Sequence, residues 1–123
     1  MFEVNADKSI YMTRGDIGTL EINADVSDGE GHTFKVGDIV RLSLFEKGNY
    51  DNVLLIKDVK VTEETTSVDI QLSNDDTSIG GTISRPKEYW YEVELNPDTV
   101  PQTLIGYDDD GPKIFKLFPG GGD

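Results

Sequence analysis

The stretch Tyr89-Trp90-Tyr91-Glu92-Val93-Glu94-Leu95 alternates between apolar or aromatic side chains at its odd positions and mostly glutamates between them. The same alternation runs through residues 19–24 and 67–72. A period of two places successive side chains on opposite faces of an extended chain, and it is typical of a strand with one buried face. The sequence therefore predicts an antiparallel, all-β protein.

Working outward from these stretches, we find turn-forming residues at regular intervals, for example in Arg14-Gly15-Asp16, Lys47-Gly48-Asn49 and Asn96-Pro97-Asp98. Short strands at this spacing are typical of a sandwich or barrel, and we predict a two-sheet antiparallel β-sandwich of about eight or nine strands. The predicted strands are residues 2–6, 9–13, 17–26, 38–46, 53–61, 66–72, 88–95, 102–106 and 113–118. The predicted core consists of Leu20, Ile22, Leu42, Leu44, Ile56, Val68, Ile70, Tyr91 and Val93.

Two segments depart from the strand pattern. Residues 73–79 are polar and begin with capping residues, which predicts one helical or 3₁₀ turn that crosses between the sheets. The Gly-rich end, residues 119–123, has few side chains that can pack and is expected to be a flexible tail. We therefore expect one sandwich domain over residues 1–118 followed by this tail.

The composition argues against several classes of function. The 24 acidic and 11 basic residues give a formal net charge of −13, which opposes binding to nucleic acid or to anionic lipid. The longest apolar run is Val53-Leu54-Leu55-Ile56, far shorter than a membrane span of about 20 residues. The N-terminus lacks the pattern of a signal peptide. Without cysteine the chain has no disulfide and no thiolate nucleophile.

The motifs that suggest chemistry are each better explained as surface or turn residues. His32 is the single histidine, and no Gly-x-Ser-x-Gly motif presents a nucleophile to it, so we expect no catalytic residues. Residues 25–30 and Asp108-Asp109-Asp110 lack the spacing of a calcium loop, and we expect no metal site and no cofactor. Arg14-Gly15-Asp16 spells an adhesion tripeptide, but it also reads as an ordinary strand connector.

Three apolar residues are candidates for an interface. Trp90 falls on the polar face of its predicted strand with Glu92 and Glu94, so it lies either under a neighbouring loop or on a contact surface. The last predicted strand, residues 113–118, carries apolar residues on both faces, and we assign Phe115 and Leu117 to a contact. The alternative is that this strand is central in the sheet.

The sequence also resembles the immunoglobulin-like N-terminal domains of phage and prophage tail proteins, including baseplate upper proteins. The resemblance lies in Ile10-Tyr11-Met12-Thr13-Arg14-Gly15-Asp16, in residues 37–44, in Asp76-Thr77 and in residues 89–95, 102–107 and 115–119. It implies an immunoglobulin-like sandwich without catalytic activity that serves as a structural or assembly module of a tail, baseplate or fibre. It further implies a virion component, made in the bacterial cytoplasm, whose partners are other tail proteins or a second copy of itself.

Two other functions remain open from the residues. A carbohydrate- or receptor-binding sandwich on a bacterial surface would need exposed aromatic side chains, for which Trp90, Tyr50 and Tyr107 are the candidates. An enzyme would need a pocket that joins His32 to carboxylates.

Overall fold

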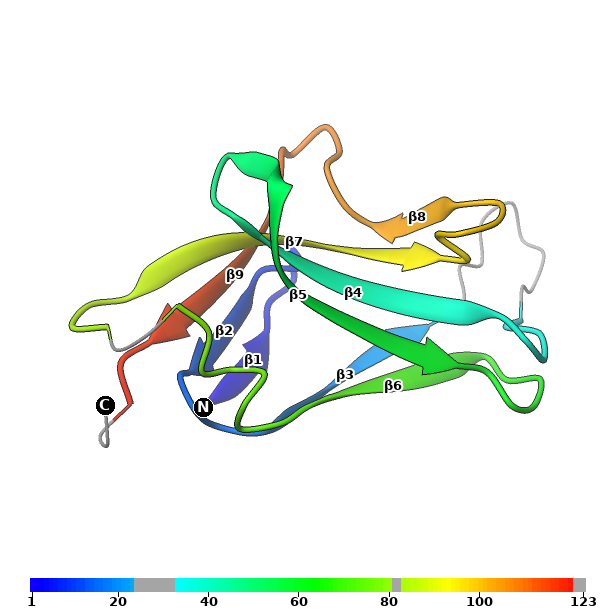
Figure 1. The fold of residues 1–123 in the computed structure, drawn as a ribbon, viewed down its shortest axis with the longest axis horizontal. Helices are drawn as coiled ribbons and strands as arrows, with labels where there is room; N and C mark the ends of the chain where they lie inside the picture. Colours follow the sequence, from blue (N-terminus) through cyan, green and yellow to red (C-terminus); the bar gives the residue numbers. More distant parts are fainter. Residues whose placement is uncertain (24–32, 81–82, 121–123) are drawn as a thin grey trace.

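The computed structural model describes residues 1–23, 33–80 and 83–120, and these form nine β-strands and no helix (Figure 1). The all-β prediction and the upper count of nine strands are therefore confirmed. Accordingly, no helix capable of crossing a membrane occurs in this part of the chain. The strands are β1 (Phe2–Val4), β2 (Ile10–Thr13), β3 (Gly18–Asn23), β4 (Ile39–Glu46), β5 (Asn49–Lys60), β6 (Ser67–Leu72), β7 (Lys87–Leu95), β8 (Gln102–Ile105) and β9 (Lys113–Phe118).

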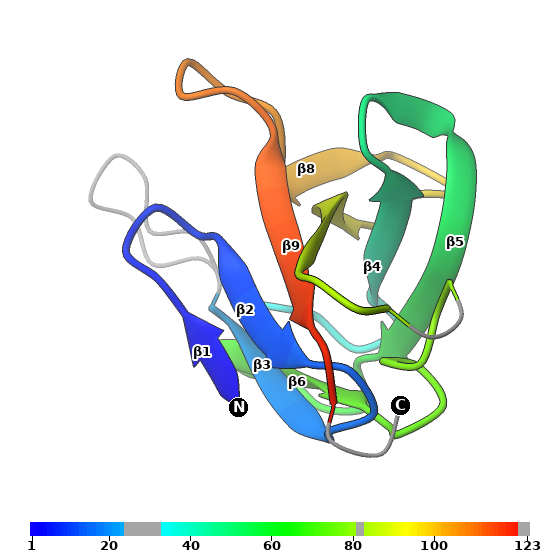
Figure 2. The same cartoon turned by 90° about the vertical axis from the view of Figure 1, so that its left-hand side faces the viewer.

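The strands form two layers of unequal size. The large sheet has the order β1-β2-β9-β7-β4-β5, with β8 paired to β7, and the small sheet consists of β3 and β6. Figures 1 and 2 show the small sheet below the large one, so that the two enclose the core between them. We call the face of the large sheet that points away from the small sheet the outer face.

The purely antiparallel prediction needs one correction, because β2 and β9 pair in parallel, with Ile10 opposite Phe115. Parallel neighbours need a long crossover, and here almost the whole chain between β2 and β9 supplies it. Local alternation predicts that a strand exists but not the direction of a partner about 100 residues away. All other strand pairs are antiparallel.

The core prediction is confirmed for eight of its nine residues, all of which are at most 7% exposed. Ile56 is the error: it lies on β5 opposite Ser43, on the outer face at the edge of the sheet, and is 51% exposed. Because Val53-Leu54-Leu55-Ile56 is apolar without interruption, alternation could not show which of its side chains face inward. The strand also begins at Asn49, four residues before the predicted start.

The predicted turn after β6 forms a corner between the sheets. The Ser73 amide donates to the Asp76 carboxylate, and the Asp76 amide donates to the Ser73 hydroxyl, which is the reciprocal pattern of a capping box. Buried Thr77 donates through its hydroxyl to the backbone oxygen of Asp16, at 2.7 Å. The corner thus anchors the β2–β3 turn. The end of the predicted strand 17–26 and residues 121–123 of the tail lie outside the described residues.

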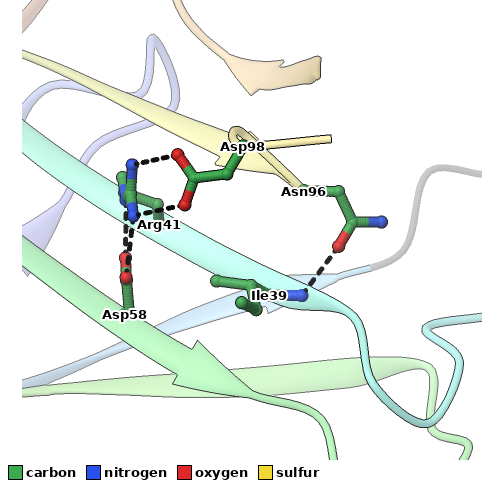
Figure 3. Close-up of polar contacts among 5 residues, drawn as sticks. All are labelled: Ile39, Arg41, Asp58, Asn96 and Asp98. Atoms are coloured by element: carbon green, nitrogen blue, oxygen red, sulfur yellow. Dashed lines mark hydrogen bonds and ion pairs between the residues drawn. The ribbon is translucent and has the colours of Figure 1, made fainter. Parts of the chain in front are cut away.

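Arg41 links three segments at one end of the outer face (Figure 3). From β4 it donates through Nε and Nη2 to the two carboxylate oxygens of Asp58 on β5, at 2.7 and 2.9 Å. It also reaches Asp98 in the turn after β7, at 3.2 Å from Nη2. Close by, the amide of Ile39 donates to the side-chain oxygen of Asn96 at 2.9 Å. These contacts hold the β7–β8 turn against the sheet.

The contrast between Ile70 and Ile56 tests the core. We expect Ile70→Ala to lower the free energy of unfolding by about 2–5 kcal/mol, because it removes buried methyl groups and leaves a cavity. Ile56→Ala, the matched control on the outer face, should cost less than about 1 kcal/mol. Urea unfolding of both variants checks this. Equal losses would contradict the assignment of the two faces.

The Arg41–Asp58 pair predicts a pH dependence. Hydrogen bonds from Arg41 lower the pKa of Asp58 below its ordinary value of 3.8. A carboxylate whose pKa is lower in the folded state stabilises the fold above its unfolded pKa, and that stabilisation is lost as the pH falls through the folded pKa. We therefore expect Asp58→Asn to be less stable than the wild type at neutral pH and to lose less stability on acidification below pH 4. Urea midpoints measured across this range check it, and parallel curves would contradict it.

Candidate docking surface

An aromatic cluster, which we define as Phe45, Tyr50 and Trp90, lies on the outer face of the large sheet. Trp90 lies between Tyr89 and Tyr91 on β7, both of which are 0% exposed, so its own side chain points away from the core. Phe45 on β4 is its cross-strand neighbour. The ring centroids of Phe45 and Tyr50 are 4.9 Å apart, and those of Tyr50 and Trp90 are 5.2 Å apart. Such spacings are favourable for aromatic pairs.

The β4–β5 hairpin brings Tyr50 over this face. Its pairing register shifts twice, between Leu44 and Phe45 and between Phe45 and Glu46, as happens at β-bulges. Bulges increase twist, and Figure 1 shows the hairpin rising above the large sheet. Gly48, with a φ of +80°, takes the left-handed conformation that this turn requires. Trp90 is therefore half-buried against Tyr50, in agreement with the alternative of a covering neighbouring segment, while its role in a contact stays a prediction.

Polar groups adjoin the aromatic cluster on the side of β8. Glu92 follows Trp90 on the same face of β7, and burial, together with the charge of Glu94, raises its pKa. Burial also raises the pKa of Tyr50, and Glu92 and Tyr107 add to this effect, which puts the three side chains in one neighbourhood. The Tyr50 hydroxyl is buried and has no hydrogen-bond partner among the described residues. Tyr107 is 65% exposed.

At the other side of the cluster, three lysines and two glutamates line a shallow hollow of about 540 Å³, and Lys87 lies there over the ring of core residue Tyr89. The Lys47 ammonium lies 2.9 Å from the Glu88 carboxylate, and Lys116 lies over the rings of Tyr11 and Phe118 at 5.7 and 5.6 Å. We call this the lysine hollow. Its lining residues are Glu46, Lys47, Pro86, Lys87, Glu88 and Lys116.

The assignment of Phe115 and Leu117 to a contact needs correction. Both side chains are 0% exposed, because β9 lies between β2 and β7 and these residues point toward the small sheet. The structure supports the alternative, a central strand. The outer face of β9 instead carries Ile114, Lys116 and Phe118. Of the three predicted interface residues, Trp90 alone remains on a surface.

The structure brings the candidate aromatics Trp90, Tyr50 and Tyr107 into one region, although they come from three separate segments. The lysine hollow was not predicted from the sequence. Its lysines lie in a hairpin turn, at the start of β7 and in β9, far apart along the chain, so no local pattern indicates that they meet.

The adhesion-like tripeptide serves as a structural connector. The Arg14 guanidinium donates to the backbone oxygen of Ser78 at 2.8 Å, and the Asp16 carboxylate accepts from the amino group of Met1. Gly15, with a φ of +88°, turns the chain between them. All three residues are thus held against neighbouring segments.

Acidic turns show no arrangement for a metal ion in the described ranges. Within residues 1–23, 33–80 and 83–120, no three His, Cys, Asp or Glu side chains are grouped closely enough to hold one. Asp108 accepts from Lys113 at 2.7 Å and from the Asp110 amide at 2.9 Å. His32 and the acidic stretch 25–30 lie outside the described residues, so the predictions about them are not tested.

No protein-family model matches this chain, and no curated protein or solved structure shows significant similarity to it.

Proposed function

We propose that this chain is a non-catalytic structural or assembly module of a phage or prophage tail, baseplate or fibre. The observation that carries the proposal is the aromatic cluster on the outer face, in which Tyr50 and Trp90 stay partly exposed beside buried Phe45. A half-buried Trp on a sheet surface is a common anchor of protein contacts. The module would dock onto a neighbouring tail protein, or onto a second copy, through this face.

The strand order supports an immunoglobulin-like sandwich of the variable type. That fold packs a sheet that contains the GFC strands against the strands B and E, and it extends the GFC sheet by C′. The order β9-β7-β4-β5 in the large sheet corresponds to GFCC′, and β3 paired with β6 corresponds to B and E. The buried Tyr89 near the start of β7 places its hydroxyl close to Gly80 in the preceding connection, where it has no hydrogen-bond partner among the described residues.

The segments that carry the family resemblance are all part of this scaffold. Ile10–Thr13 forms β2, and the stretches 37–44 and 89–95 supply most of β4 and β7. These strands build the large sheet and support its outer face. A module of this kind acts by presenting a surface, which agrees with aromatic and charged residues on strands rather than in a deep pocket.

A second candidate, a carbohydrate- or receptor-binding sandwich, is favoured by the polar side of the cluster. Sugars stack on exposed aromatic rings and hydrogen-bond to carboxylates and hydroxyls. Exposed Tyr107 and half-buried Glu92 offer these groups in the neighbourhood of Tyr50.

Incorporation into particles tests the first proposal. We expect mass spectrometry to detect the chain in tail particles purified from the bacterium that carries its gene. Trp90→Ser should abolish incorporation, because it removes the central aromatic anchor, while Val100→Ser, a control at an exposed apolar residue in the β7–β8 turn, should not. Circular dichroism must show that both variants fold. Particles without the wild-type chain, or with equal amounts of both variants, would contradict the proposal.

Fluorescence tests the second candidate, because Trp90 is the single tryptophan and reports directly on the cluster. If sugars bind there, titration with bacterial cell-wall oligosaccharides should shift and saturate the emission, and Tyr107→Ser should weaken this response. Tyr11→Ser is the matched control, since Tyr11 lies beside Lys116, outside the cluster. A saturating response that Tyr107→Ser leaves unchanged would rule out this site.

A further inference from the structure

The small sheet has an open edge along β6. This sheet has only two strands, so β6 pairs with β3 on one of its edges alone. In Figures 1 and 2, β5 lies beside β6, but it belongs to the large sheet and does not pair with β6. The edge of a strand presents backbone N–H and C=O groups that an added strand can pair with.

Hydrogen bonds at the two ends of β6 show which residues face this open edge. The Ser67 amide donates to the Thr65 hydroxyl at 3.3 Å, and the Ser67 carbonyl oxygen accepts from the same hydroxyl at 3.0 Å. At the other end, the Ser73 amide donates to the Asp76 carboxylate, and the Ser73 carbonyl oxygen accepts from the Thr77 amide. Ser67 and Ser73 therefore direct their backbone groups away from β3.

The alternation of the strand then places the backbone groups of Asp69 and Gln71 on the open edge. In an antiparallel pair, every second residue points its N–H and C=O toward the same side. Asp69 and Gln71 thus share the direction of Ser67 and Ser73, and the residues between them bond to β3. No hydrogen bond from the described residues occupies these four groups. Two backbone donors and two backbone acceptors are available there.

The exposed face of the small sheet carries an unbalanced pair of carboxylates at this edge. Glu21 on β3 and Asp69 on β6 are directly opposite each other, and both are exposed. Like charges in this position repel each other and destabilise the pair of strands. Neither strand contains Lys or Arg, and neither carboxylate has an ion pair within the described ranges. A cation on an added strand would relieve this repulsion.

A hollow of about 390 Å³ continues the open edge at the end of β6, where Gln71 and Leu72 line it. Ile17, which is 75% exposed, lies on one side and Lys57 of β5 on the other. The Lys57 ammonium is already paired with the Asp76 carboxylate at 2.9 Å. The hollow therefore offers an added strand apolar surface rather than a second charge.

We propose that the open edge of β6 binds an extended strand of a partner protein that carries Lys or Arg opposite Asp69. The strand pairs antiparallel with β6, exchanges hydrogen bonds with the backbone of Asp69 and Gln71, and places its cation beside Glu21. Its residues opposite Val68 and Ile70 face inward, toward β5, and are apolar. The edge belongs to the small sheet, so this inference does not depend on docking through the aromatic cluster.

Charge selects a basic partner strand over a second copy of β6. Two β6 strands paired edge to edge would gather four carboxylates, Glu21 and Asp69 of each copy, on one continuous face. Each chain also carries a net charge of −13, which opposes this contact further. Alternate apolar and basic residues avoid the repulsion and still supply the backbone hydrogen bonds.

Hydrogen exchange followed by NMR tests the edge itself. In the chain alone, the amides of Asp69 and Gln71 should exchange quickly, whereas those of Val68 and Ile70 should exchange slowly because they bond to β3. Slow exchange of all four amides would overturn the proposal, since the edge would then already be occupied.

Three synthetic peptides with blocked ends test the partner. The first, Thr-Val-Lys-Val-Lys-Val-Thr, has the proposed pattern, the second carries Glu in place of both Lys, and the third is the first with N-methyl groups on the amides of both Lys. We expect the first to bind and to slow the exchange of the Asp69 and Gln71 amides. The other two should bind at least about tenfold more weakly, because one lacks the cation and the other lacks the backbone donors.

Charge reversal on the protein completes the test. Asp69→Lys should weaken binding of the lysine peptide by at least about tenfold and strengthen binding of the glutamate peptide. Asp109→Lys, the control, makes the same change in net charge at an exposed residue between β8 and β9 and should bind like the wild type.

Circular dichroism verifies that both variants fold, and the three peptides decide the question on the wild type alone if Asp69→Lys does not. No binding of the lysine peptide, equal binding of any two peptides, or an equal loss in both variants would each overturn the proposal.

Discussion

The insertion of β9 between β2 and β7 is the constraint on which the rest of the structure depends. This strand, near the C-terminal end of the sequence, pairs in parallel with β2 near the N-terminal end. On its other edge it pairs antiparallel with β7. Both faces of β9 carry apolar residues, and its central position gives both of its edges a hydrogen-bonded neighbour. Phe115 and Leu117 then complete the core, while Ile114 and Phe118 are left for the outer face.

Closing the core in this way leaves the outer face free to carry aromatic and charged residues. The small sheet has only two strands, so the large sheet extends well beyond what the small one covers. Across that sheet the tyrosines of β7 face the core, whereas the tryptophan between them faces outward. The bulged β4–β5 hairpin supplies Tyr50 as a cover, beside which Phe45 is buried and Trp90 is half-buried.

Charged residues of both signs lie around the large sheet. The acidic residues occupy polar strand faces and turns, as expected for a strongly charged surface. The lysines that escape this pattern, at positions 47, 87 and 116, meet because a hairpin turn and the ends of two paired strands are brought to one side of the sheet. The ammonium groups of Lys87 and Lys116 lie over aromatic rings, and that of Lys47 pairs with the Glu88 carboxylate.

The sequence by itself determined the strands and most of the core, because alternation is a local property that each strand carries in full. It identified Leu20, Ile70 and Val93 as buried and Trp90 as an outward residue. It did not determine the face of Ile56, where the alternation is lost, nor the parallel pairing of β2 and β9. Only the tertiary structure decided that Phe115 and Leu117 are core residues and that Tyr50 and Trp90 share one face. Those properties depend on pairing between segments distant in the chain, and a local period contains no information about such pairing.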